Sequence, residues 1–178
     1  FLDPAESLDD DEKRQIDRIH ELFDTHGLDG HARWLPMRTD KTQVGEFYRC
    51  VADRRGAFIQ PALYEAFGLT VVEAMSSGLP TFATCHGGPL EIIEDGVSGF
   101  HIDPMRPEET AERIAKTMAR FREAPADWDE ISRGSLMRIE SRYNWPLYAN
   151  QLLTLSRIYG FWKYITNIER EETRRYLD

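Results

Sequence analysis

The chain has 178 residues, a length that favours one domain with a single hydrophobic core. Its net charge of −9 argues against nucleic acid or an anionic membrane as a partner, because both attract clustered Lys and Arg. No apolar run approaches the ~18 residues of a membrane-spanning helix. With only two cysteines, the composition predicts a cytoplasmic protein without a disulfide framework.

The first elements precede the apolar part of the chain. A helix is predicted over residues 8–25, capped by Ser7 and with acidic side chains in its first turn that complement the helix dipole. Residues 32–35 are predicted to form a short strand and residues 44–52 a second helix.

Three short apolar runs follow, and a helical pattern separates each from the next. The runs at residues 57–60, 81–84 and 99–102 are predicted to be buried strands, and residues 69–77 and 90–94 to be helices. This alternation predicts an α/β fold with a Rossmann-like parallel sheet. Ligands of such sheets bind beyond the carboxyl ends of the strands.

The rest of the chain is predicted to be helical, over residues 107–123, 128–143, 145–165 and 168–177. We therefore expect an α/β region over residues 1–104 and a helical C-terminal extension over residues 105–178 that packs on it. The many aromatic side chains of the extension are interpreted as packing residues rather than a cofactor site, with docking on another domain as the alternative for Phe161 and Trp162.

A candidate site lies where the first strand of the series turns into its helix. Glu65 and Glu73 flank Gly68, which precedes the helix and lets an anion approach the backbone closely. Free N–H groups at a helix N-terminus suit a phosphate, and a carboxylate farther along suits sugar or ribose hydroxyls. The alternative is that both acids only solvate a helix face. Gly87 and Gly88, in the next strand-to-helix turn at the same sheet edge, favour the functional interpretation.

The thiols and imidazoles show no metal-binding spacing. Cys50 and Cys85 are expected to be reduced and structural. Among the five histidines, only His86 is a candidate for a ligand contact, because it adjoins Gly87 in the loop at the active edge.

Several of these segments resemble known families. The run from Gln60 to Met75 resembles the Glu-x7-Glu motif of retaining glycosyltransferases with the GT-B fold. The segments at residues 78–89, 99–104 and 159–163 are similar to the sucrose synthase family in particular. The resemblance extends over almost the whole chain, and it identifies the α/β region as a nucleotide-sugar-binding region of a C-terminal GT-B domain.

The resemblance implies reversible transfer of glucose between sucrose and a nucleoside diphosphate, with NDP-glucose and fructose as the other pair of substrates. Carried over by position, Glu65 would contact the transferred glucose and Glu73 the ribose hydroxyls. No metal or other cofactor is expected beyond the nucleotide substrate, because the helix dipole and basic residues neutralise the diphosphate. The residues expected to hold the diphosphate and sugar are Phe67, Gly68, Leu69, Thr70, Gly87 and Gly88.

The nucleobase is expected beside Arg38 and Val44. In plant-like members of the family, these positions hold Gln and Asn next to uracil, and this chain departs at both. Either UDP or ADP is therefore a candidate substrate. Arg38 would stack on a purine or donate to it, unless it points to solvent and the backbone alone contacts the base.

The resemblance also implies an N-terminal GT-B domain that binds the acceptor, and a homo-oligomeric parent protein. The chain begins at Phe1, so we expect an excised piece that lacks the first two strands of its domain and is inactive alone. The alternatives are a GT-B transferase of the sucrose-phosphate synthase or glycogen synthase type, and a non-catalytic nucleotide-binding module.

Overall fold

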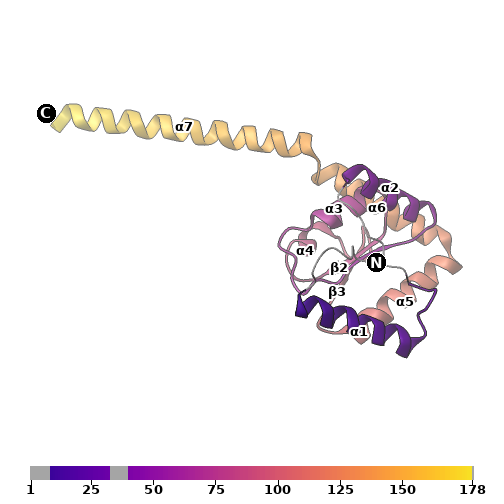
Figure 1. Cartoon of the computed structure of the whole chain (residues 1–178). Coiled ribbons are helices and arrows are strands. Elements are labelled where there is room, and N and C mark those ends of the chain that lie inside the picture. Colours follow the sequence, from indigo (N-terminus) through magenta and orange to yellow (C-terminus); the bar gives the residue numbers. More distant parts are fainter. Residues whose placement is uncertain (1–8, 33–39, 178) are drawn as a thin grey trace. The chain divides into compact units, whose positions relative to one another are not determined.

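The computed structural model describes residues 9–32 and 40–177 (Figure 1). The chain divides into two compact units, residues 1–44 and residues 45–178. Helix α2 (Lys41–Asp53) contains the boundary between them. None of the helices in these ranges is long and apolar enough to cross a membrane.

The first unit contains helix α1 (Asp10–His26), whose start differs from the prediction. Asp9 is its N-cap: its side chain accepts from Glu12 N at 2.8 Å, and Glu12 returns a hydrogen bond to Asp9 N at 3.1 Å. This reciprocal capping box satisfies two free donors at once, so the helix begins after Asp9. The predicted cap Ser7 lies outside the described residues, as does most of the strand predicted at 32–35; Ala32 is not in a strand.

The second unit contains the predicted parallel sheet. Strands β1 (Phe58–Gln60), β2 (Thr81–Thr84) and β3 (Phe100–Ile102) pair in this order, with β2 in the middle. Helix α3 (Leu69–Ser76) joins β1 to β2, and α4 (Pro89–Ile92) joins β2 to β3. All three strands confirm their predictions to within one residue, and so does the α/β fold class.

Neighbouring residues of β2 point to opposite faces of the sheet, as the pleat requires. Phe82 stacks on Phe100 of β3, with ring centroids 4.8 Å apart. On the other face, Ala83 packs with Val71 and Met75 of α3. The sheet is therefore covered on both faces, which accounts for the uninterrupted burial of β2.

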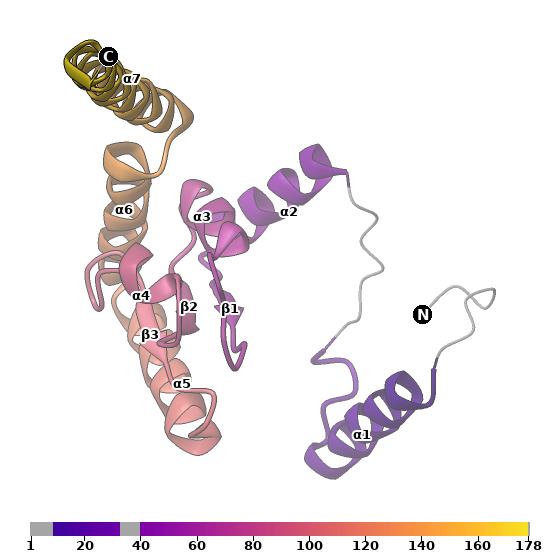
Figure 2. The same ribbon diagram turned by 90° about the vertical axis from the view of Figure 1, so that its left-hand side faces the viewer.

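Three helices complete the described part of the chain: α5 (Pro107–Glu123), α6 (Pro125–Arg142) and α7 (Trp145–Leu177). Figure 2 shows α5 and α6 beside the strands. The two helices predicted at 145–165 and 168–177 are wrong as separate elements, since α7 runs through both. Thr166 and Asn167 between them are neither Pro nor Gly, and neither residue breaks the helix.

Helix α6 lies against residues that precede the strands. Trp128 donates its indole N–H to Gly56 O, before β1, at 2.8 Å. The buried Ser135 hydroxyl donates to Ser98 O, before β3, at 2.7 Å. One helix thus anchors the amino edge of the sheet through one buried and one partly buried hydrogen bond, and the opposite, carboxyl edge is left to loops.

Helix α5 is attached to β3 by Arg113. Its guanidinium donates to both carboxylate oxygens of Asp95, at 2.7 and 2.8 Å, and to His101 O at 2.8 Å. Burial alone would raise the pKa of Asp95, but the hydrogen bonds from Arg113 and from the His101 backbone N–H outweigh it and lower that pKa below its usual value.

The lowered pKa of Asp95 predicts a pH-dependent contribution to stability. The charged pair stabilises the fold above the unfolded-state pKa of about 4, and this contribution is lost as the pH falls through the lower folded-state value. Because the Asp95 side chain is 45% exposed, we expect Asp95→Asn to lower the free energy of unfolding by only about 0.5–1 kcal/mol at pH 7. Urea unfolding at pH 7 and pH 3 measures this loss of free energy of unfolding. Asp17→Asn, on the exposed surface of α1, is the control. If Asp95→Asn lowers the free energy of unfolding as much at pH 3 as at pH 7, the charged pair of Asp95 and Arg113 is not the source of this stability.

Candidate functional site

Two loops at the carboxyl edge of the sheet pair through their backbones. Glu65 N, in the loop after β1, donates to His86 O, in the loop after β2, at 3.1 Å. Gly88 N donates to Glu65 O at 2.8 Å, which gives an isolated parallel bridge between Glu65 and Gly87. The pairing of β1 with β2 is thereby extended into the loops, and it places Glu65 beside the glycine turn.

This pairing depends on the absence of side chains at two positions. A Cβ at Gly88 would lie 2.0 Å from Phe67 O, and one at Gly87 would lie 2.1 Å from Glu65 O. Both distances are far below van der Waals contact, and both neighbours are backbone atoms. Gly87 also has φ +100°, a conformation that strains other residues.

The Glu65 carboxylate is held at both oxygens. Oε1 accepts hydrogen bonds from Phe67 N at 3.2 Å and Gly68 N at 3.0 Å, and Oε2 accepts one from the Gln60 side-chain amide at 2.7 Å. The other amide atom, Gln60 Oε1, is buried and has no hydrogen-bond partner among the described residues. A buried unpaired acceptor costs about 1–3 kcal/mol, while the amide nitrogen of the same side chain orients Glu65.

Helix α3 begins next to this carboxylate. The N–H groups of Leu69, Thr70 and Val71 lie in its first turn and have no acceptor within the helix. The side chains of Leu69 and Thr70 are exposed, so this end of the helix is open at the surface. The arrangement offers free donors and the positive end of the helix dipole to an anion.

Glu73 lies farther along α3 and is exposed. Burial, and then the negative charge of Glu73, raise the pKa of the Tyr48 hydroxyl on α2. Among the described residues, no hydrogen bond joins Glu73 to Glu65. The two carboxylates of the motif thus occupy different surroundings.

The structure brings five of the predicted site residues into one cluster: Glu65, Phe67, Gly68, Gly87 and Gly88. Val44 lies in α2, at the end of the first unit. Arg38 lies outside the described residues. The roles assigned to all of these residues stay predictions.

A pocket of about 360 Å³ adjoins the paired loops. Tyr64 and Phe67 line it from one loop, Leu90 from α4, and Tyr143 follows α6. The Tyr143 hydroxyl donates to Glu91 O at 3.0 Å, which holds this wall in place. The volume is within the range of small-molecule sites.

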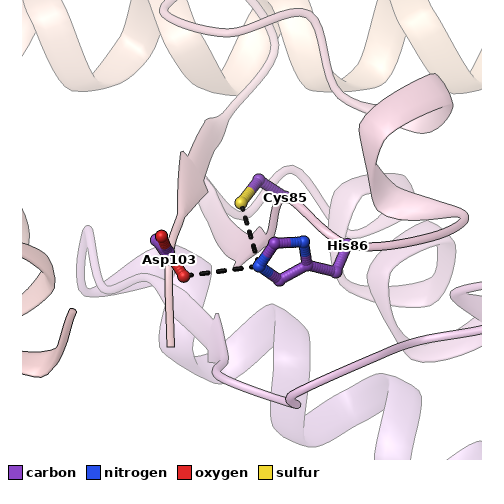
Figure 3. A group of neighbouring side chains, drawn as sticks. All are labelled: Cys85, His86 and Asp103. Carbon is purple, nitrogen blue, oxygen red and sulfur yellow. Dashed lines mark hydrogen bonds and ion pairs between the residues drawn. The ribbon is translucent and has the colours of Figure 1, made fainter. Parts of the chain in front are cut away.

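A cluster of three side chains at the same edge was missed by the sequence analysis (Figure 3). His86 Nε2 lies 3.7 Å from Cys85 Sγ and 3.3 Å from Asp103 Oδ1. The pKa of Asp103 is lowered, chiefly by the hydrogen bond from the Met105 backbone N–H. Burial opposes this effect, and His86 and Arg106 add to it. The available signal was that Asp103 directly follows β3, as Cys85 follows β2.

Comparison with known proteins places the chain among glycosyltransferases. Residues 11–134 match the family model of the glycosyl transferases group 1. The chain is 58% identical to the sucrose synthase of Nitrosomonas europaea, over 99% of this chain and 22% of that protein. It is 53% identical to sucrose synthase 3 of Arabidopsis thaliana, over 99% of this chain and 22% of that protein. The chain thus spans just over a fifth of the length of these relatives.

Solved structures share the fold at lower identity. HepE of Anabaena in complex with UDP has a TM-score of 0.69 at 23% identity, over 83% of this chain and 38% of that one. Sucrose-phosphate synthase of Thermosynechococcus elongatus has a TM-score of 0.68 at 24% identity, over 89% of this chain and 36% of that one. The likeness confirms the predicted C-terminal GT-B fold.

The contact between the two loops yields a prediction on Gly87. Gly87→Ala combines backbone strain with a collision against Glu65 O, whereas Gly96→Ala has a similar φ of +75° but open space around it. We expect Gly96→Ala to lower the free energy of unfolding by about 1 kcal/mol and Gly87→Ala by about 2 kcal/mol more. Urea unfolding of both variants measures the difference. Equal losses would show that the loops do not depend on this close approach.

Proposed function

The chain belongs to the glycosyl transferases group 1, and from this we propose that the protein containing it is a retaining hexosyltransferase of the sucrose synthase type. The proposed reaction is the reversible transfer of glucose between sucrose and a nucleoside diphosphate. The observation that carries this proposal is the 51–58% identity to sucrose synthases along the whole chain. The likeness to sucrose-phosphate synthase, at 24% identity, supports that alternative only weakly.

The proposed chemistry assigns the leaving diphosphate to the N-terminus of α3. In sucrose cleavage, the bond between glucose C1 and the fructose oxygen breaks, and that oxygen takes a proton from the attacking phosphate or from solvent. A bond from C1 to a phosphate oxygen of the nucleotide forms on the same face of the sugar. In the reverse direction, negative charge develops on the diphosphate, and the first-turn N–H groups of α3 are oriented to stabilise it.

Glu65 is proposed to contact the transferred glucose. Its two oxygens already accept from Gln60, Phe67 and Gly68, so the carboxylate is oriented without further rearrangement. A preoriented negative group near C1 favours the positive charge that develops there as the glycosidic bond breaks. The proposed catalytic role is thus supported by the position and orientation of the carboxylate.

Glu73 is proposed to accept hydrogen bonds from the ribose hydroxyls. We further propose that ADP is used at least as well as UDP, because Arg38 offers only donors where uracil-binding relatives have Gln. Fructose is expected to bind a separate N-terminal domain. A homo-oligomeric assembly and a cytoplasmic location are also part of the proposal.

The reaction is tested by incubating the full-length protein with sucrose and either UDP or ADP. We expect release of fructose and formation of the corresponding NDP-glucose, with ADP at least as efficient as UDP. In the reverse direction, fructose should be the acceptor. A preference for fructose 6-phosphate would instead support the sucrose-phosphate synthase type, and binding of nucleotide without transfer would support a non-catalytic module.

Within the same assay, Glu65→Gln should separate catalysis from binding. We expect kcat to fall about 100-fold, the scale for losing one group that stabilises the transition state, with little change in nucleotide affinity. Glu108→Gln, on the exposed first turn of α5, is the matched control. If only donor affinity changes and turnover is intact, the role of Glu65 is plain binding.

Glu73→Ala should weaken nucleotide binding. Loss of a hydrogen bond to a charged acceptor costs about 1.5–3 kcal/mol, which corresponds to a Kd about 10- to 150-fold higher. Isothermal titration with UDP and with ADP measures it, and Glu123→Ala, at the exposed end of α5, serves as control. Unchanged affinity for both nucleotides would remove Glu73 from the binding site.

A further inference from the structure

The cluster of Cys85, His86 and Asp103 joins the ends of two neighbouring strands. Cys85 and His86 follow β2, and Asp103 follows β3. Figure 3 shows the His86 ring between the other two side chains, with the same nitrogen, Nε2, facing both. A Cys–His–Asp triad would use the two ring nitrogens separately, one for the thiol and one for the carboxylate, so this geometry does not fit such a triad.

The three side chains instead bring one potential ligand atom each into a small group. Their ligand atoms Sγ, Nε2 and Oδ1 all lie within 4.8 Å of one another. A zinc ion has bonds of about 2.3 Å to sulfur and about 2.0–2.1 Å to nitrogen and oxygen, so adjacent tetrahedral ligands lie about 3.3–3.6 Å apart. The separations of 3.7 Å between Sγ and Nε2 and 3.3 Å between Nε2 and Oδ1 are close to these values.

We propose that Cys85, His86 and Asp103 bind a zinc ion at the carboxyl edge of the sheet. The combination of a soft thiolate, an imidazole and a carboxylate suits Zn²⁺, whereas Mg²⁺ and Ca²⁺ prefer oxygen ligands alone. Binding releases the thiol proton of Cys85 to solvent, and His86 coordinates through Nε2 with its proton on Nδ1.

Neighbouring groups orient the proposed ligands. Asp103 Oδ1 accepts from Met105 N at 2.9 Å, and Arg106 pairs with Oδ2 at 3.7 Å, which leaves a lone pair of Oδ1 for the ion. The backbone of His86 is fixed by its N–H, which donates to Thr84 Oγ1 at 3.2 Å. Such outer contacts limit the reorganisation that metal binding requires.

The site provides three protein ligands, and all three residues are partly exposed. A fourth position is therefore open to water or to a ligand, as in zinc sites that are not purely structural. Because Glu65 N donates to His86 O, an ion on the His86 ring would stabilise the loop that positions Glu65. This zinc site is additional to the proposed glycosyl transfer and does not depend on it.

Cobalt is the spectroscopic probe for this site. The full chain, titrated with Co²⁺, should bind one equivalent and show a near-ultraviolet thiolate-to-cobalt charge-transfer band that Zn²⁺ displaces. Cys85→Ser should abolish the band, and His86→Gln and Asp103→Asn should weaken Zn²⁺ binding at least about 10-fold. The matched controls Cys50→Ser and His101→Gln should bind as the unaltered chain does. No band at excess Co²⁺, or a band that persists in Cys85→Ser, would overturn the proposal.

A second readout needs no variant. Zn²⁺ should slow the alkylation of Cys85 by iodoacetamide and leave that of the exposed Cys50 unchanged, as followed by mass spectrometry of the peptides. The cysteines thus provide an internal control in one molecule. Equal rates at Cys85 with and without Zn²⁺ would overturn the proposal independently of how any variant folds.

Discussion

The backbone pairing between the loops after β1 and β2 is the constraint on which the rest of the site depends. Two hydrogen bonds, Glu65 N to His86 O and Gly88 N to Glu65 O, hold these loops together beyond the last strand residues. They fix the backbone of Glu65 just before α3, and Gln60, Phe67 and Gly68 then hold its carboxylate. They also fix the backbone of His86, and through it the imidazole next to Cys85 and Asp103. The pairing of these two loops thus links both groups of functional candidates.

The two edges of the sheet are held by different means. At the amino edge, side chains of α6 donate to buried carbonyl groups and satisfy them, as Ser135 does for Ser98. At the carboxyl edge, glycines bring backbones into contact, and the buried Gln60 Oε1 has no partner among the described residues. Side-chain hydrogen bonds from a helix hold the first edge, whereas close backbone approaches hold the second and orient its polar groups. That division is typical of α/β folds whose ligands bind beyond the strand ends.

Local pattern was enough to predict the elements whose boundaries are set locally. The strand at Thr81–Thr84 and the helix at Pro107–Glu123 were predicted to the residue, because Pro80 and Pro107 mark their starts. Contacts between residues distant in sequence could not be predicted in this way. Asp103 is 17 residues from His86, and only the pairing of β2 with β3 brings them together. The continuity of α7 was missed because Thr166 and Asn167 have low helix propensity, which did not prevent the helix from continuing.

The hydrogen bonds of Glu65 also limit how an anion can use this edge. Sequence reasoning assigned the backbone at Phe67 and Gly68 to the diphosphate, together with Leu69 and Thr70. In the structure, the first two N–H groups donate to the Glu65 carboxylate, so a phosphate at the same donors would have to displace one negative charge by another. The N–H groups of Leu69 and Thr70 have no such competitor within the helix. For the proposed site, the free donors of the helix end therefore suit a phosphate better than those of Phe67 and Gly68, and Glu65, with its own donors in place, suits the uncharged hydroxyls of a sugar.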